Sequence, residues 1–139
     1  MAAIHHIAIG ARDVEAVAGL YREVFEATEC ARHEYDDGTL RSIWLEAGGA
    51  TLMIERTERF EERVEGVGAG LFLVAFEVEA QERARLEERL EAAGSTIEER
   101  TRFSSYARDP EGNRVAVSHH PDPPDREMRR RLEGGEGVE

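Results

Sequence analysis

Hydrophobic and polar residues alternate at the start of the chain, in the segment IHHIAIG (residues 4–10). In a strand, residues two apart share a face, so His6 and Ala8 point away from the face that carries Ile7 and its neighbour Ile9. Apolar residues then recur at the spacing of an amphipathic helix of about three turns. They are Val14, Val17, Ala18, Tyr21, Val24 and Phe25. The pattern therefore predicts a strand that leads directly into a helix.

Two turn signals divide the rest of the first half into strands. Asp37-Gly38 is typical of a hairpin turn, and Gly48-Gly49 predicts a second turn. The segment TLRSIWLEA (39–47) lies between these turns, and ATLMIE (50–55) follows the second. A weaker strand is expected near 28–35. The first half is therefore predicted to run in the order strand, helix and three strands.

The same order returns in the second half of the chain. A strand is predicted at 71–79 and a helix at 81–94, in which Leu86, Leu90 and Ala93 share one face. A turn with the sequence DPEG, of the kind in which Pro is followed by Gly, precedes the last strand. The three further predicted strands are residues 95–100, 103–108 and 113–118.

This internal repeat organises the whole chain. It predicts one α+β domain over residues 1–121, built from two βαβββ modules with mixed sheets. The modules and their connector are residues 4–65, residues 71–120 and the Gly-rich residues 66–70. Residues 122–139 are expected to form a mobile, charged tail with a short helix at 126–132. The Glu/Arg runs at 56–65 and 82–91 are interpreted as solvated faces.

Charge narrows the classes of partner. The formal net charge of the chain is −12, which disfavours nucleic acid and anionic membranes as partners because both require a basic surface. The same charge favours a cationic ligand. All 18 basic residues are Arg, so chemistry that depends on a lysine, such as Schiff-base formation, is excluded.

Cysteine usage and hydropathy indicate a cytoplasmic protein. Cys30 is the single cysteine, so an internal disulfide cannot form. A catalytic role for its thiol is disfavoured, because no His or Asn is visibly placed to activate it. No apolar run approaches the roughly 18 residues of a membrane span, and the first residues lack the basic leader of a signal peptide.

Several motifs together resemble the vicinal oxygen chelate superfamily. They are the doubled βαβββ order, the opening IHHIAIGARDV, the segment LMIE and the turn ARDPEGNRVAV. This superfamily includes glyoxalase I, extradiol dioxygenases, methylmalonyl-CoA epimerase, fosfomycin-resistance enzymes and bleomycin-binding proteins. The resemblance covers about residues 4–120. It implies that the two sheets curl around one open cleft, which holds a metal and a small molecule, and that the chain forms a homodimer.

The resemblance also implies where metal ligands are expected. In metal-dependent members they come from the first and last strand of each module, which here are the positions of His6, Glu55, Leu73 and Ala116. His6 and Glu55 can ligate a divalent metal such as Zn, Ni, Mn or Fe. Leu73 and Ala116 carry no donor atom, so the standard metal site is incomplete.

Three interpretations of this half-site stay open. In the first, His6 and Glu55 are a remnant, and the protein binds a small organic molecule without a metal. In the second, they hold a metal together with His120 or a substrate oxygen. In the third, the pair only forms a hydrogen bond.

Four further residues are candidates for contact with a ligand. Tyr106 stands where related enzymes often have a substrate-touching Tyr, although it could equally fill space between the sheet and a partner. Trp44 could stack on a flat ligand, with a core or interface position as the alternative. Arg114 could bind a carboxylate or phosphate, or pair with a neighbouring Glu. Glu77 shares a strand face with Ala75 and would add negative charge to the cleft.

The sequence therefore favours a small-molecule-binding member of this superfamily with an incomplete metal site. Its ligand is expected to be cationic and aromatic. The alternative is a glyoxalase-like lyase or isomerase, or a dioxygenase-like enzyme, with an atypical metal site in which Glu55 also acts as a base. A non-catalytic interaction domain is the third class, because fold does not fix function.

Overall fold

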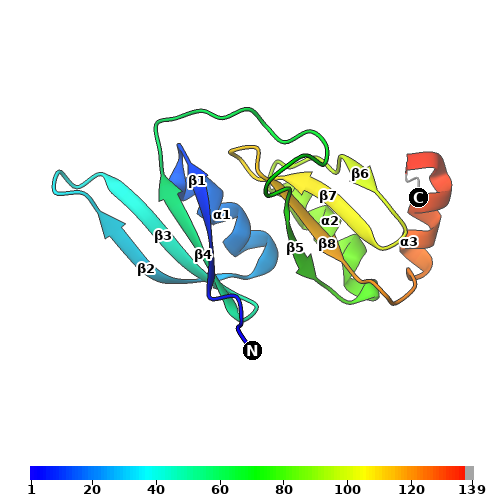
Figure 1. The fold of residues 1–139 in the computed structure, drawn as a ribbon. Coiled ribbons are helices and arrows are strands. Elements are labelled where there is room, and N and C mark those ends of the chain that lie inside the picture. The colour runs from blue at the N-terminus through cyan, green and yellow to red at the C-terminus, as the bar shows by residue number, and fades with distance from the viewer. Residues whose placement is uncertain (137–139) are drawn as a thin grey trace. The chain divides into compact units, whose positions relative to one another are not determined.

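A computed structural model describes residues 1–136 of the chain (Figure 1). The chain divides into two compact units, the first comprising Met1–Glu62 and the second beginning at Arg63. Each unit contains one four-stranded mixed sheet. The α+β fold class and the doubled strand–helix–three-strand order are thereby confirmed.

The first unit follows the predicted order closely. Its elements are β1 (His6–Ala11), α1 (Val14–Phe25), β2 (Thr28–Glu34), β3 (Leu40–Ala47) and β4 (Ala50–Arg56). The strands lie in the order β1-β4-β3-β2, with β1 parallel to β4 and the other pairs antiparallel. The weak strand predicted near 28–35 is β2 at the edge of this sheet.

Helix α1 covers one face of the first sheet and forms the core of the unit with it. Asp13 caps the helix by accepting a hydrogen bond from the backbone N–H of Ala16 at 3.0 Å. The predicted apolar face of α1 is buried apart from the half-buried Phe25. The sheet residues buried beneath it are Ile9, Ala11, Ile43, Leu45, Leu52 and Ile54. The alternation read from β1 is therefore confirmed, with Ile9 turned toward the core and His6 exposed.

The second unit repeats this plan with shorter strands. Its elements are β5 (Val74–Glu77), a 3-10 turn η1 (Ala80–Glu82), α2 (Arg83–Ala92), β6 (Glu99–Arg100), β7 (Ser104–Arg108), β8 (Arg114–Ser118), α3 (Arg126–Arg131) and a π-helical turn η2 (Leu132–Glu136). The strand order β5-β8-β7-β6 matches the first sheet position for position. Residues 71–73 and 95–98 were predicted as strand and are not strand in the structure.

The turn between β7 and β8 is fixed by one carboxylate. Asp109 Oδ1 accepts hydrogen bonds from the backbone N–H groups of Glu111, Gly112 and Asn113, at 2.9, 3.0 and 2.9 Å. Its Oδ2 accepts a further bond from the Asn113 side chain at 2.9 Å. Gly112 has φ +100°, a conformation that L side chains rarely adopt. These contacts explain why Asp, Gly and Asn occupy this turn.

The interpretation of residues 82–91 as a solvated face is wrong at Arg83. This side chain is fully buried between α2 and the sheet. Its Nε donates to Ser105 Oγ at 2.7 Å, and its Nη atoms donate to backbone carbonyls of the loop before β7 and of the first residue of β7. Nη1 also lies 3.0 Å from His119 Nε2. Buried charge persists where every donor finds a partner, and this guanidinium holds the β6–β7 loop against the helix.

Glu87, one turn further along α2, is also fully buried. Its carboxylate accepts hydrogen bonds from Arg100 on β6, from Ser105 on β7 and from Arg131 on α3. Burial raises the pKa of Glu87, but the hydrogen bonds from Arg100, Ser105 and Arg131 outweigh it and hold that pKa below its ordinary value. One carboxylate thus joins α2 to two strands and to the last helix.

Helix α3 lies in the segment that was expected to be a mobile tail. Asp125 caps it by accepting from the Met128 N–H at 2.8 Å, and the Met128 side chain is fully buried. The short helix predicted at 126–132 is therefore confirmed, and it packs against α2, where Arg131 donates to Glu87. Within residues 1–136, no helix is long and apolar enough to cross a membrane.

Replacing Glu87 with Gln should destabilise the second unit by about 3 kcal/mol at pH 7, because Arg100 and Arg131 lose a buried counter-charge. Since folding lowers the pKa of Glu87, its contribution is complete above the ordinary value of 4.5 and is lost as pH falls through the folded pKa. Urea unfolding of wild type and Glu87→Gln at pH 7 and near pH 3.5 measures the difference, which should shrink at the lower pH. Glu88→Gln is the matched control, because the Glu88 side chain is 67% exposed and its loss should cost little. Equal effects of the two substitutions would contradict this account.

Candidate functional site

The face of the first sheet that points away from α1 carries a row of polar side chains. Strand pairing places Glu55 opposite Gly10 on one side and Ser42 on the other, with His33 next to Ser42. The next row contains Ala8, Met53, Trp44 and Ala31, in the order of the strands. Among the larger side chains of these rows, those of His33, Trp44, Met53 and Glu55 are half-buried.

Trp44 lies at the centre of this face and is held on two sides. Its Nε1–H donates to Glu55 Oε2 at 3.1 Å. The His33 ring packs against it edge to face, with ring centroids 4.7 Å apart. His33 is in turn held by a 2.9 Å hydrogen bond between its Nδ1 and the hydroxyl of Ser42, which is almost completely buried. The indole is therefore fixed in place while part of it stays exposed.

The structure brings Trp44 and Glu55 together, and the sequence predicted both as site residues. It also adds His33 and Ser42, which sequence reasoning missed. The one signal in the sequence was weak: Ala31 and His33 are two residues apart and so share a face of a strand whose other residues are mostly polar. Their contact depends on the pairing of β2 with β3, which no single segment reveals.

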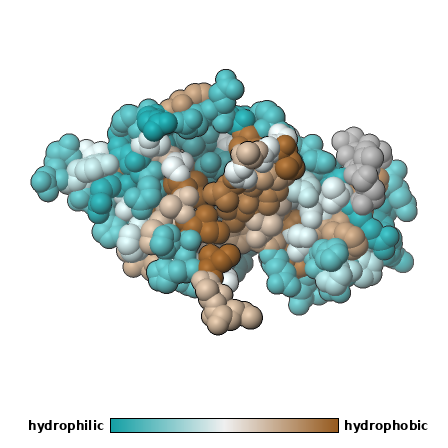
Figure 2. All heavy atoms as spheres, in the orientation of Figure 1, coloured by the Kyte–Doolittle hydropathy of each residue, from teal (hydrophilic) through white to brown (hydrophobic). Residues whose placement is uncertain are grey.

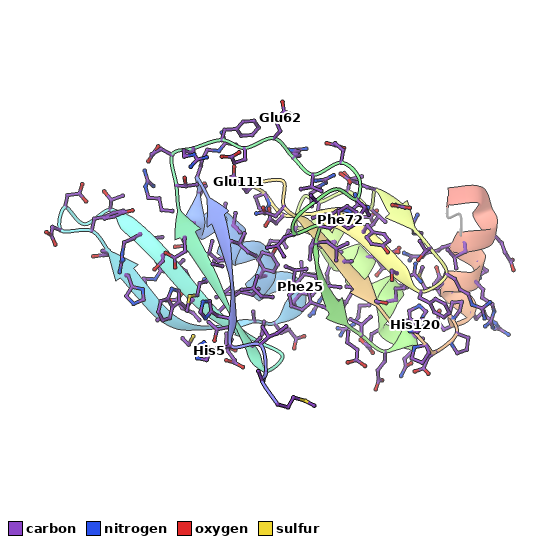
Figure 3. The ribbon with its side chains drawn as sticks, in the orientation of Figure 1. His5, Phe25, Glu62, Phe72, Glu111 and His120 are labelled. Atoms are coloured by element: carbon purple, nitrogen blue, oxygen red, sulfur yellow. The ribbon has the colours of Figure 1, made fainter. Side chains whose placement is uncertain are left out.

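His6 and Glu55 share this face, as predicted, but they do not converge. His6 pairs with Thr51, and Glu55 lies four residues further along β4. At about 3.3 Å per residue, their backbones are separated by about 13 Å along the strands. The exposed His6 ring instead contacts His5, which is labelled in Figure 3, with their Nδ1 atoms 3.0 Å apart.

The other two ligand positions of the resemblance lie in the second unit. Leu73 directly precedes β5, and Ala116 lies on β8 opposite Ala75. His120, the proposed substitute ligand (labelled in Figure 3), is exposed beyond the end of β8, and its ring lies against Phe103 with centroids 4.9 Å apart. In the described part of the chain, no three His, Cys, Asp or Glu side chains come together as a metal site would require.

Tyr106 and Arg114 contact each other on the face of the second sheet that points away from α2. The Arg114 guanidinium carbon lies 5.0 Å from the centre of the Tyr106 ring and 4.8 Å from that of Phe72. Arg114 also pairs with Glu99 at 3.0 Å, which was the alternative that the sequence left open. Glu77 is exposed on β5, opposite Ser118.

A separate polar pocket of about 350 Å³ lies at the end of the first unit. Hydrogen bonds from Thr39 hold the pKa of Asp37, one of its lining residues, below the ordinary value. The tip of this unit at the turn between β2 and β3 is covered by hydrophilic residues (Figure 2). The pocket contains no residue that the sequence predicted for a site. Its lining residues are Tyr35, Asp37, Thr39, Arg56, Thr57 and Glu58.

Comparison with known proteins agrees with this architecture. Residues 3–117 match the family model described as the Glyoxalase/Bleomycin resistance protein/Dioxygenase superfamily. No curated protein matches the chain.

Solved structures show the same fold at low sequence identity. A point mutant of the fosfomycin resistance protein FosX from Listeria monocytogenes, complexed with Mn(II) and 1S,2S-dihydroxypropylphosphonic acid, has a TM-score of 0.74 and 20% identity, over 93% of this chain and 98% of that chain. FosX from Mesorhizobium loti has a TM-score of 0.71 and 19% identity, and the match covers 96% of this chain and 98% of that chain. TioX from Micromonospora sp. ML1 has a TM-score of 0.64 and 21% identity, and the match covers 86% of this chain and 99% of that chain.

Proposed function

Because the chain belongs to the Glyoxalase/Bleomycin resistance protein/Dioxygenase superfamily, we propose that it binds a small organic molecule on the face of the first sheet that carries Trp44. The ligand is a cationic aromatic compound. The observation that carries this proposal is the hydrogen bond from the Trp44 Nε1–H to Glu55, which joins a half-buried indole to a carboxylate.

The arrangement of Trp44 suits a flat, positively charged ligand. Trp is the aromatic side chain with the strongest attraction for cations, and the ligand meets it already ordered, so little conformational entropy is lost on binding. Ala31, the neighbour of Trp44 on β2, has a small side chain that leaves room beside the indole. The net charge of −12 favours the approach of a cation to this surface.

The carboxylate of Glu55 supplies the second element of recognition. Oε2 is occupied by the Trp44 N–H, which leaves Oε1 able to accept a hydrogen bond or to face a positive charge. A positive charge on the ligand is attracted more strongly by a half-buried carboxylate than by a fully exposed one, because solvent screens the interaction less. Glu55 therefore serves in ligand binding under this proposal and not as a catalytic base.

Binding under this proposal does not require the standard metal site. Leu73 and Ala116 provide no ligand atoms, and His6 lies about 13 Å along the sheet from Glu55. The alternative function is a metal-dependent lyase or isomerase with an atypical metal site, in which His6 binds the metal together with a substrate oxygen. The close pair of His5 and His6 nitrogens is the observation that favours it, since imidazole is a common metal ligand.

We further propose that the protein acts in the cytoplasm and forms a homodimer. Its one cysteine, Cys30, is exposed and free, which suits a reducing compartment. The homodimer rests on resemblance to the superfamily.

N-methylquinolinium should bind the protein at least about tenfold more tightly than quinoline at pH 8, because only the former is charged. Glu55→Gln should weaken N-methylquinolinium binding about tenfold and leave quinoline binding nearly unchanged. Isothermal titration calorimetry measures both affinities. Glu23→Gln is the matched control, because it removes the same charge from an exposed position on α1. Equal affinity for the two compounds, or equal effects of the two substitutions, would overturn the role given to Glu55.

The metal content of the purified protein separates the two candidate functions. We expect less than about 0.1 equivalent of Zn, Ni, Mn or Fe by elemental analysis without added metal, because two donor residues rarely hold such an ion. His6→Ala should leave the affinity for N-methylquinolinium unchanged. A stoichiometric metal that disappears in His6→Ala would favour the metal-dependent enzyme and refute the first proposal.

A further inference from the structure

The second unit begins with residues 63–72, a segment that forms no helix or strand and that we name the strap. The Arg63 side chain fills the space beside Gly112, where an added Cβ would come within 2.6 Å of Arg63 Nε. Glu65 pairs with Arg108 at 3.7 Å. At the end of the strap, the ring of Phe72, labelled in Figure 3, stacks on the guanidinium of Arg114.

Arg114 is held between two rings and two carboxylates. Phe72 and Tyr106 lie 4.8 and 5.0 Å from its guanidinium carbon. Its Nη2 donates to Glu99 at 3.0 Å, and Nη1 lies 3.9 Å from Glu98. The side chain is only 8% exposed. Its Nε is buried without a hydrogen-bond partner, the one such side-chain atom among the described residues.

This unpaired Nε makes the contact of the strap with Arg114 marginal. A buried donor without a partner costs free energy of the same order as a stacked cation–π contact gains. The strap also contains Gly66, Gly68 and Gly70, and its apolar residues Val67 and Leu71 are 84% and 88% exposed. Few buried contacts therefore oppose its displacement.

We propose that Phe72 occupies, in the free protein, a subsite on Arg114 that receives the flat aromatic ring of a ligand. The ligand ring replaces Phe72 on the guanidinium, opposite Tyr106, and the strap moves aside so that water reaches Nε. This subsite belongs to the second unit alone, so it goes beyond the function proposed for Trp44 and Glu55.

The charges around Arg114 restrict the chemical class of this ligand. Its guanidinium already faces Glu98 and Glu99, and Glu65 lies on the strap near Arg108. A carboxylate or phosphate on the ligand would meet the carboxylates of Glu98 and Glu99, which stay in place when the strap moves, so an anion is disfavoured. A cation would be repelled by the guanidinium itself. The subsite therefore selects an uncharged aromatic ring, which uses only the face of Arg114.

The test uses the full chain and 4-quinolone as an uncharged flat probe. Phe72→Ala should bind 4-quinolone about tenfold more tightly than wild type, because the internal competitor is gone. Phe72→Leu keeps most of the apolar volume and should also bind more tightly, which guards against loss of folding in the smaller variant. Adding Arg114→Lys to either variant should abolish the gain, because an ammonium offers no flat face. Phe103→Ala removes a ring that lies on a different arginine, Arg102, and should leave affinity unchanged.

The readout is calorimetry together with the NMR resonance of the Arg114 Nε–H group. Saturable binding should shift this resonance in the Phe72 variants, and 2-naphthoate, an anion, should not. No gain in affinity in either Phe72 variant, a gain equal to that of Phe103→Ala, or a gain that survives Arg114→Lys would overturn the proposal. The fluorescence of Trp44, the one tryptophan of the chain, reports separately on the first unit, so failure of one proposal is distinguishable from failure of the other.

Discussion

Each sheet in this protein buries one face beneath a helix, and the position of every candidate site residue depends on that constraint. Strand residues alternate between faces, so burial of Ile9, Leu52 and Ile54 against α1 turns their neighbours outward. On β4 this places Met53 and Glu55 on the far face. A shift of one residue in strand pairing would bury Glu55 in the core at large cost, which fixes the register.

The second unit meets the same constraint with charged residues in its interior. Beneath its sheet, Arg83 and Glu87 replace part of the hydrocarbon that α1 provides in the first unit. Their partners come from the β6–β7 loop, from β7 and from α3, so polar contacts position elements that short strands alone would hold weakly. The far face then carries Arg114, whose guanidinium stacks on two rings. The two modules share a topology while differing in the chemistry of both faces.

Sequence periodicity predicted the fold well because the strongest signals were local. The alternation around Ile9, the apolar stripe of α1 and the DPEG turn each lie within a few residues, and the structure confirms them. Arg83 and Glu87 escaped prediction because a Glu/Arg-rich helix normally indicates a solvated surface, and only the partners on other elements reverse that expectation.

The site was predicted in part for the same reason. The sheet face on which His6, Trp44 and Glu55 lie follows from the alternation of side chains along single strands. The four-residue offset between His6 and Glu55, and the contact of His33 with Trp44, follow from pairing between strands. Pairing depends on the tertiary arrangement of distant segments, so a half-site for metal could be expected from the sequence while its two members lie apart in the fold.

The central claim is that Trp44 and Glu55 together bind a cationic aromatic ligand. The chain has a single indole, so its Nε1–H gives one NMR resonance that needs no assignment by mutation. Titration of the ¹⁵N-labelled protein with N-methylquinolinium should shift this resonance saturably in wild type and in Glu23→Gln, and much less in Glu55→Gln. An indole resonance that stays unmoved while the ligand binds elsewhere would contradict the account.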